Sequence, residues 1–267
     1  MKISFVGSGR MAGAMIASLI RAKVAQPSEI FASDVDAERR NALKRQCGVN
    51  VYAGNTVVLG MANVVILAVK PQTLDEVLQE IAPAVTREHL VLSIAAGRKI
   101  ADIEAVLPHA RVVRVMPNVA CLVSEGMSAF ALGARAQESD RHLVRKLLTS
   151  FGRAAELAEE QFDAVTALSG SGPAFYAYVL ELMARAAIAE GLPEGEARLL
   201  AAQTMLGTAR LLLDKQMSAK DLIAMVASPK GTTAAGLSVL EASAIGSVLE
   251  ETIRAAARRS RELSGGG

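Results

Sequence analysis

The first 157 residues alternate short apolar runs with helical patterns, and this alternation constrains the fold more than any other feature. The apolar runs cover residues 2–6, 30–33, 64–68, 90–94, 112–115 and 127–132. Helical periodicity covers residues 11–22, 36–46, 74–81, 100–107 and 140–150. Successive strand–helix units of this kind build a parallel sheet with helices on both faces. We therefore predict an α/β fold whose first domain, residues 1–158, is doubly wound.

The second half of the chain lacks this alternation. Helical patterns cover residues 162–168, 174–190, 194–213, 220–226, 233–242 and 247–263. Residues 197–213 are apolar on more than one face, and a single small layer of helices cannot shield such a surface from water. We predict an all-α second domain, residues 159–267, that buries this surface against another subunit and ends in a disordered tail, residues 264–267.

Composition and charge exclude several classes of function. The 29 Lys and Arg residues nearly balance 27 Asp and Glu residues, which gives a net charge of +2. Aromatic residues make up 3% of the chain, with no Trp, so little is available for stacking on bases or sugar rings. We therefore expect no nucleic-acid partner.

Neither the apolar runs nor the cysteines indicate a membrane or secreted protein. The longest apolar run ends at Lys70 and Pro71, short of the roughly 18 residues that span a bilayer. The N-terminal run meets Gly7 before it reaches the length of a signal-peptide core. Cys47 and Cys121 form no CxxC pair or metal-ligand pattern. We expect a cytoplasmic protein with no membrane partner and no metal.

A glycine-rich turn directly follows the first apolar run. Gly7, Gly9 and Ala12 fit the pattern G-x-G-x-x-A between a predicted strand and a predicted helix. In this context the first glycine permits a tight turn, the second lets a pyrophosphate approach the backbone, and the small third residue lets the helix pack closely. N–H groups at the helix start then attract negative charge. The turn predicts a dinucleotide site in a Rossmann-like domain.

The end of the second predicted strand bears on which dinucleotide is used. Asp34 lies about twenty residues after the glycine turn, where an acidic residue usually binds the ribose hydroxyls of NAD. Ser33 and Arg39 could instead bind a 2′-phosphate, and Arg39 alternatively lies on a solvated helix face. The residues themselves leave NADH and NADPH open.

The chain shows no nucleophile–base set and no paired carboxylates. Its histidines, His89, His109 and His142, are scattered near the ends of predicted elements. Hydride transfer from a nicotinamide needs mainly positioning, because the cofactor supplies the chemistry. The absence of a catalytic set is therefore compatible with a dehydrogenase or reductase.

Two segments rich in small residues lead into predicted helices of the second half, at residues 168–174 and 227–236. The second offers backbone donors, hydroxyl groups and Lys230 at a helix start, which suits a carboxylate ligand. The alternative is that Ser228 or Thr232 only caps the helix. The sequence leaves both interpretations open.

Six short motifs are spread over nearly the whole chain, at residues 7–12, 67–72, 93–97, 114–118, 167–174 and 228–233. Their identity and order resemble those of the Δ1-pyrroline-5-carboxylate reductase family. The resemblance implies an NADPH- or NADH-dependent enzyme that transfers hydride to the imine carbon of Δ1-pyrroline-5-carboxylate, giving L-proline in the last step of proline biosynthesis. It also implies an obligate homodimer, assembled further in some members, whose helical domains interlock and whose active site combines both chains.

The resemblance also assigns roles to individual residues. It places Asn55 beside the adenosine, and it places the residues that follow the predicted strands 90–94 and 112–115 beside the nicotinamide. The cofactor-binding residues that it implies, together with the glycine turn, are Gly7, Gly9, Arg10, Met11, Ala12, Ser33, Asp34, Asn55, Ala68, Val69, Lys70, Pro71, Ala95, Met116, Pro117 and Asn118. The residues that it implies for the substrate carboxylate are Ser228, Lys230, Gly231, Thr232 and Thr233. Thr233 is the expected catalytic residue, which orients or protonates the imine nitrogen.

This chain departs from the family pattern at three places. Val119 and Ala120 replace a common Thr-Pro, which removes a hydroxyl group and a rigid turn beside the nicotinamide. Arg10 replaces a common Asn and either contacts a phosphate or faces solvent. Lys230 replaces a common Gly, so its ammonium can attract a carboxylate while its stem restricts the turn.

Two alternative functions follow from the same fold. A β-hydroxyacid dehydrogenase shares the glycine turn and a helical second domain but needs a catalytic Lys, and residues 174–190, the corresponding helix, contain none. A non-catalytic dinucleotide-sensing protein would retain the fold without the need for residues 228–233, which are intact.

Overall fold

The computed structural model describes residues 1–265, and the backbone forms two compact units. The first contains Met1–Ser171 together with the C-terminal residues from Ala256 on, and the second contains Gly172–Ala255. This division lies after Ser171, whereas the sequence pattern places its change at residue 158. The predicted tail extends to residues 266–267, which lie outside the described residues.

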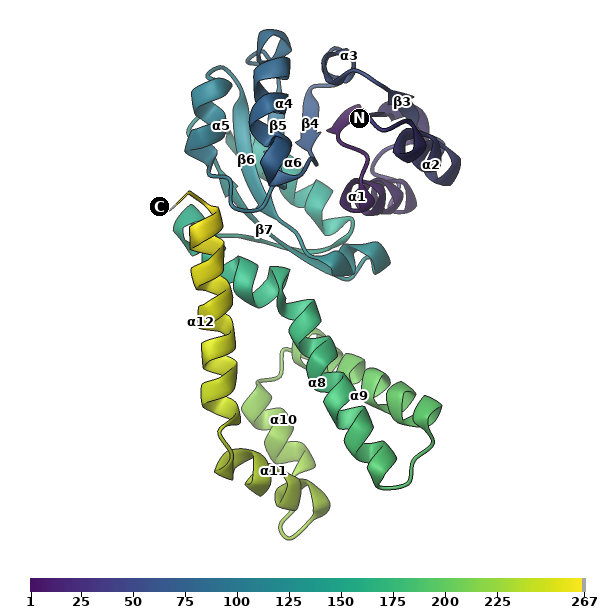
Figure 1. Cartoon of the computed structure of the whole chain (residues 1–267), viewed down its shortest axis with the longest axis vertical. Helices are drawn as coiled ribbons and strands as arrows, with labels where there is room; N and C mark the ends of the chain where they lie inside the picture. Colours follow the sequence, from purple (N-terminus) through teal and green to yellow (C-terminus); the bar gives the residue numbers. More distant parts are fainter. Residues whose placement is uncertain (266–267) are drawn as a thin grey trace. The chain divides into compact units, whose positions relative to one another are not determined.

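Eight strands form one sheet in the first unit, in the order β3-β2-β1-β4-β5-β6-β7-β8 (Figure 1). Their bounds are β1 (Ile3–Val6), β2 (Ile30–Ser33), β3 (Asn50–Tyr52), β4 (Val64–Leu67), β5 (Leu90–Ser93), β6 (Arg111–Met116), β7 (Gly126–Leu132) and β8 (Gly152–Glu156). The first six strands run parallel to one another. The order β3-β2-β1-β4-β5-β6 is that of the Rossmann fold, so the predicted fold class is confirmed.

The prediction of a parallel sheet is wrong at one edge. Strand β7 pairs antiparallel with β6, and β8 pairs parallel with β7. The link between β6 and β7 contains only the short 3₁₀ turn η4 (Val119–Val123). A parallel connection needs a crossover of about a dozen residues or more, so this short link reverses the chain. The strands β3 and β8 are absent from the sequence prediction.

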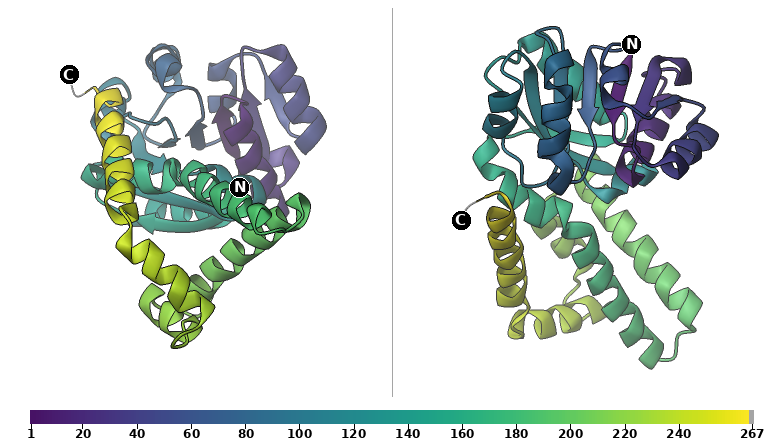
Figure 2. Two further views of the ribbon diagram at one scale, coloured as in Figure 1. Left: turned by 60° about the horizontal axis from the view of Figure 1, so that its bottom comes forward. Right: turned by 45° about the horizontal axis from the view of Figure 1, so that its top comes forward.

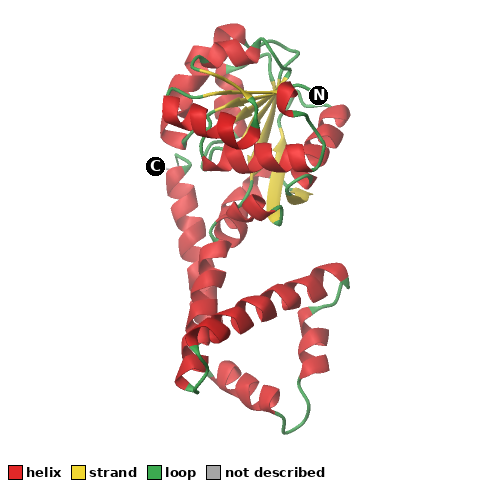
Figure 3. Ribbon diagram, turned by 90° about the vertical axis from the view of Figure 1, so that its right-hand side faces the viewer, coloured by secondary structure: helices red, strands yellow, loops and turns green. Residues whose placement is uncertain are grey.

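Helices cover both faces of this sheet (Figure 3). Their bounds are α1 (Arg10–Arg21), α2 (Ala37–Cys47), α3 (Asn55–Leu59), α4 (Leu74–Ile81), α5 (Ile100–Val106) and α6 (Glu138–Thr149). Successive strand residues point to opposite faces, so Phe5 packs in the cluster under α1, α2 and α6, and Val6 packs in the cluster under α3, α4 and α5. These two buried clusters are the core expected of a doubly wound domain.

The short helix α7 (Phe162–Val165) belongs to the first unit. Phe162 is fully buried in the cluster under α3, α4 and α5, and the guanidinium of Arg114 lies 4.7 Å from the centre of its ring. The end of the last helix also belongs to this unit, where the Ser260 hydroxyl donates to Asp163 Oδ1 at 2.6 Å. These contacts explain why the first unit extends to Ser171 and includes the C-terminal residues.

The second unit contains helices alone, as predicted. Its elements are α8 (Gly172–Ala189), α9 (Glu194–Asp214), α10 (Ala219–Val226), α11 (Thr232–Ala242) and the first part of α12 (Ile245–Leu263). Helices α8 and α9 lie side by side (Figure 2). Within residues 1–265, no single helix has the length and apolarity to cross a membrane, and α11 and α12 reach those limits only together, as a bent pair.

Candidate functional site

The loops that follow β1, β2, β4, β5 and β6 surround a cavity of about 1020 Å³ at the carboxyl edge of the sheet. The strand order reverses between β1 and β4, and ligands of open α/β sheets bind at such a reversal. Of the residues predicted to bind the cofactor, this cavity is lined by Gly7, Gly9, Arg10, Met11, Asp34, Asn55, Ala68, Val69, Lys70, Pro71, Ala95, Met116, Pro117 and Asn118. The structure thus brings these residues together within the first unit.

The glycine turn has the shape that a pyrophosphate needs. Gly7 has a φ of +102°, and a Cβ atom there would lie 2.7 Å from the carbonyl oxygen of Ala68. A Cβ atom on Gly9 would meet nothing within 4 Å, so the chain is open on that side. Gly9 is the N-cap of α1 and makes no side-chain cap, which leaves N–H groups of the first turn available. These features fit the dinucleotide that the sequence predicts.

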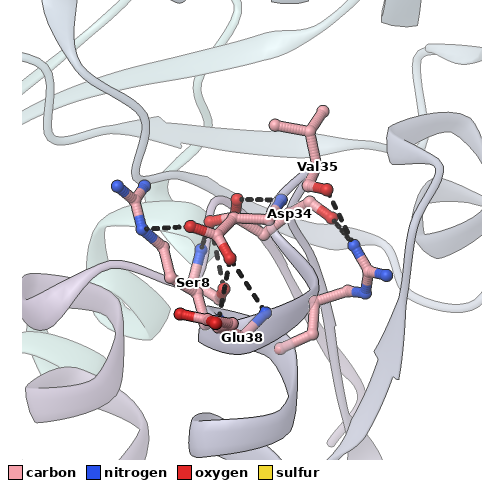
Figure 4. Close-up of polar contacts among 7 residues, drawn as sticks. Ser8, Asp34, Val35 and Glu38 are labelled. Carbon is pink, nitrogen blue, oxygen red and sulfur yellow. Dashed lines mark hydrogen bonds and ion pairs between the residues drawn. The ribbon is translucent and has the colours of Figure 1, made fainter.

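The carboxylate of Asp34 is fixed against the glycine turn (Figure 4). Its Oδ2 accepts hydrogen bonds from the Ser8 N–H at 2.9 Å and the Ser8 hydroxyl at 3.0 Å, and its Oδ1 accepts from the Asp36 N–H at 3.0 Å. Burial acts to raise the pKa of Asp34, but these donors and the charge of Arg39 outweigh it, so the pKa lies below its ordinary value. The side chain therefore carries its charge at neutral pH.

Ser33 and Ala12 do not line the cavity. Both are fully buried, and Ala12 packs in the cluster under α1. The Ser33 hydroxyl donates to Asn55 Oδ1 at 2.8 Å, and Asn55 Nδ2 donates to Glu80 Oε2 at 2.7 Å. This chain of hydrogen bonds fixes the Asn55 carboxamide at the cavity wall. Ser33 thus contacts a residue of the cavity wall and does not itself line the cavity, contrary to its predicted role as a cofactor ligand.

The cavity has a wall that sequence reasoning missed, at α4 and the turn before it. Thr73, Glu76, Val77 and Glu80 all line the cavity. Their spacing of three, four and seven residues places them on one face of a helix, and this periodicity was a usable signal. The remaining lining residues are Val35, Ile94, Ala96 and Gly170, together with Arg39 and Val119, which the sequence had already indicated near the cofactor.

A π-helical turn brings the motif at residues 167–174 to the cavity wall beside Asn118. The turn covers Thr166–Gly170, and the Ser171 N–H donates to the Thr166 carbonyl at 2.8 Å. Asn118 Nδ2 donates to the Ser169 hydroxyl at 3.3 Å, and Gly170 lines the cavity. Single π-helical turns occur frequently at functional sites. This turn adds to the cavity wall beside Asn118 a segment to which the sequence assigned no role.

The segment predicted to bind the substrate carboxylate lies in the second unit. The Gly231 N–H donates to the Ser228 carbonyl at 3.0 Å, which closes a tight turn, and Lys230 has a φ of +59° within it. Gly231 is the N-cap of α11 and makes no side-chain cap. The interpretation that Ser228 or Thr232 only caps this helix is therefore wrong. The N–H groups at the start of α11, including that of Thr233, are left available.

Within residues 1–265, no group of three or more His, Cys, Asp or Glu side chains could hold a metal ion. Cys121 is buried and Cys47 is half-buried, and burial raises the pKa of both thiols. Both cysteines are unbridged and lie in packed surroundings, as expected of packing residues.

The sheet order, the glycine turn and the cavity define a dinucleotide-binding protein of the Rossmann class. A family model described as pyrroline-5-carboxylate reductase dimerisation matches residues 159–263, and one described as NADP oxidoreductase, coenzyme F420-dependent, matches residues 2–97. The pyrroline-5-carboxylate reductase of Methanosarcina acetivorans is 42% identical over 263 residues, which cover 98% of this chain and 97% of that protein. The chain belongs to the pyrroline-5-carboxylate reductase family, as the sequence motifs imply.

Solved structures of the family share the whole fold. The pyrroline-5-carboxylate reductase of Coxiella burnetii aligns with a TM-score of 0.93 and 32% identity, over 98% of each chain. The pyrroline carboxylate reductase of Plasmodium falciparum, solved with NADP bound, aligns with a TM-score of 0.88 and 26% identity, over 99% of this chain and 98% of that one. The two-part architecture predicted from the sequence is thus that of the family.

Proposed function

We propose that this chain reduces Δ1-pyrroline-5-carboxylate to L-proline, with NADPH or NADH as the hydride donor. The observation that carries the proposal is the 42% identity, over 98% of the chain, to a protein named pyrroline-5-carboxylate reductase. The cavity at the carboxyl edge of the sheet supports it, because its lining suits a dinucleotide. The NADP-bound relative from Plasmodium falciparum supports the choice of cofactor.

The first unit binds and orients the cofactor in this proposal. Gly7, Gly9 and the start of α1 receive the pyrophosphate, and Asn55 presents a fixed carboxamide to the adenosine side. Met116, Pro117 and Asn118 border the nicotinamide, which supplies a hydride when it is bound. Asn118 Oδ1 also accepts hydrogen bonds from the Ala120 and Met127 N–H groups, and these bonds fix the shape of the loop.

The second unit receives the substrate. The N–H groups at the start of α11 and the ammonium of Lys230 suit the substrate carboxylate. Reduction of the C=N bond places the hydride on carbon and a proton on nitrogen. The hydroxyl group of Thr233 orients the imine nitrogen or supplies that proton, and this makes Thr233 the main catalytic side chain.

We also propose that the chain acts as a homodimer through its helical unit. Leu199, Leu206 and Leu213 recur every seven residues on α9, and each is at least 47% exposed in the single chain. Side chains seven apart share one helix face, so they form an apolar stripe that a second copy can cover. The match to a model described as a dimerisation domain supports this assignment. The cytoplasmic location stays a prediction.

The test measures the oxidation of NADPH and of NADH through the fall in absorbance of the reduced nicotinamide. Purified protein receives either Δ1-pyrroline-5-carboxylate or the keto product of a β-hydroxyacid. We expect rapid oxidation with the cyclic imine and none with the keto acid. The product should be L-proline. Oxidation with the keto acid alone would assign the chain to the β-hydroxyacid dehydrogenase alternative. Nucleotide binding without oxidation would favour a dinucleotide sensor.

A further inference from the structure

Asp34 occupies the position that usually binds the ribose hydroxyls, and its carboxylate already accepts hydrogen bonds from the protein itself. An ionised carboxylate offers about four acceptor sites. Three hydrogen bonds occupy Asp34, two from Ser8 and one from the Asp36 N–H. An aspartate that binds both ribose hydroxyls must leave two acceptor sites facing the ligand. Asp34 has one left, and its bonds hold the glycine turn in place.

Arg39, by contrast, has a free end at the same part of the cavity. It lies in the first turn of α2 and lines the cavity, and its side chain is 53% exposed. Its Nε lies 3.3 Å from Asp36 Oδ2. Among residues 1–265, its two terminal guanidinium nitrogens make no hydrogen bond and no close ion pair, although the charge of the guanidinium also acts on Asp34. A guanidinium fork that is held at Nε and free at both ends can bind a phosphate through two parallel hydrogen bonds.

The charges around the cavity favour a phosphate on this side. Arg10 and Arg39 line it from α1 and α2, with Asp34 beside them, Lys70 lines it from the loop after β4, and Glu76 and Glu80 line it from α4. A phosphate carries nearly two negative charges at neutral pH. It is attracted by the arginines and Lys70 and repelled by Asp34 and the glutamates. Two arginines against one carboxylate make the wall at α1 and α2 more favourable for the anion than the wall at α4, where both charged residues are acidic.

We propose that Arg39 selects dinucleotides that carry a 2′-phosphate on the adenosine ribose, and that Asp34 supports the glycine turn and does not bind the ribose hydroxyls. This inference rests on the proposed dinucleotide site. It makes NADPH the preferred donor and Arg39 the residue that sets the preference, which the sequence left open.

Calorimetric binding of two nucleotides tests the role of Arg39 without any turnover. The probes are adenosine 2′,5′-bisphosphate, which carries the 2′-phosphate, and adenosine 5′-monophosphate, which lacks it. We expect wild type to bind the bisphosphate more tightly by a factor of about 10 or more. Arg39→Met should weaken the bisphosphate by about 10- to 100-fold, the usual range for a lost charge-assisted contact, and leave the monophosphate within about twofold.

Two further variants isolate the guanidinium. Arg45→Met removes an exposed positive charge from the same helix but from outside the cavity, and it should change neither affinity by more than about twofold. Arg39→Lys keeps the charge without the fork and should restore only part of the bisphosphate affinity. An equal loss in Arg39→Met and Arg45→Met would reduce the effect to net charge and overturn the assignment.

Asp34→Asn tests the second half of the proposal. If Asp34 supports the turn, the variant weakens both nucleotides by a similar factor, because the turn that receives the shared 5′-phosphate loosens. A selective loss of monophosphate affinity would identify Asp34 as the ribose ligand and overturn this half. The Arg39 comparison does not depend on this variant.

The same titrations separate this inference from the proposed function. Equal binding of both nucleotides by wild type overturns the Arg39 assignment and leaves the reductase reaction with NADH as its donor. Binding of neither nucleotide overturns the dinucleotide site itself, and the proposed function with it.

Discussion

The two compact units of this chain differ in how far they bury their large apolar side chains. In the first unit, large side chains such as Phe5 and Phe130 are fully buried, in clusters on both faces of the sheet. In the second unit, the fully buried side chains are small, as with Ala184 and Ala197, while Leu199 on α9 is 68% exposed. The first unit therefore contains its own core, and the second resembles one half of a larger core.

This difference in burial points to different roles for the two units. A self-contained core can hold a cofactor cavity in a fixed shape, because every strand that supports a loop is packed on both faces. A helical unit with exposed apolar faces gains its order from a partner. Substitutions in the first unit should then change nucleotide binding, and substitutions in the second should change dimer association or turnover.

The largest effect is expected from Leu206→Glu, in the middle of the apolar stripe on α9. Burying one leucine contributes about 1.5–3 kcal/mol, and in a two-fold dimer each substitution counts twice. The expected cost of about 3–6 kcal/mol weakens the dimer by a factor of about 10² to 10⁴. Sedimentation velocity over a range of protein concentrations measures this change.

Val57→Glu is the matched control for this lesion. Val57 is 46% exposed, close to the 47% of Leu206, but it lies on α3 of the first unit. We expect Val57→Glu to leave the dimer intact. The contrast between the two units would fail if Leu206→Glu remained fully dimeric, or if wild type sedimented as a monomer.

Thr233→Ala is expected to have the next largest effect. Loss of one orienting or proton-donating hydroxyl should lower kcat/KM for the cyclic imine by about 10- to 1000-fold, with little change in nucleotide affinity. Ser238→Ala on the same helix is the control, since its hydroxyl donates only to the Ala235 carbonyl. Unchanged turnover in Thr233→Ala would remove this residue from the mechanism.

The sequence predicted the order of the elements better than their pairing. The buried strands β1, β2, β4, β5 and β6 carry strong apolar signals, and their positions are confirmed within one or two residues. The edge strands β3 and β8 are short and only partly buried, so their sequences lack an apolar run. The direction of β7 depends on the length of a link, which apolar patterns do not report.

Within the site, the sequence predicted contacts along the chain better than contacts across it. Ser33 and Asp34 are neighbours at the end of a strand, and neighbouring strand residues point to opposite faces. The alternation of side chains along the strand was therefore already a reason not to expect Ser33 and Asp34 to line the same cavity. The hydrogen bond between Asn118 and Ser169 joins residues 51 apart in sequence through a π-helical turn, and no local pattern predicts such a pair.

Gly7→Ala should damage the first unit and leave the second unaffected. The new Cβ atom would lie 2.7 Å from the Ala68 carbonyl oxygen at a φ of +102°, so the turn must move. We expect a loss of about 1–3 kcal/mol in unfolding free energy and a large loss of nucleotide affinity, with an unchanged dimer. Gly13→Ala is the control within α1, where the nearest atom would lie 3.8 Å away. It should instead stabilise the protein by about 0.5–1 kcal/mol. Denaturant unfolding at one fixed protein concentration measures both changes.

The smallest expected effect concerns the charge of Asp34, and it separates the two units by pH. Because the pKa of folded Asp34 lies below its ordinary value, its bonds to Ser8 and Asp36 stabilise the folded state at neutral pH. This contribution is lost as the pH falls through the folded pKa.

Asp34→Asn should therefore be less stable than wild type by about 1 kcal/mol above pH 5, and the gap should close from roughly pH 4 downward. Denaturant unfolding across this range measures the gap, and sedimentation at each pH should show the same dimer affinity for both proteins. A gap that persists at low pH would mean that the Asp34 side chain stabilises the turn by its shape, and a pH-dependent difference in dimer affinity would mean that the two units do not respond independently.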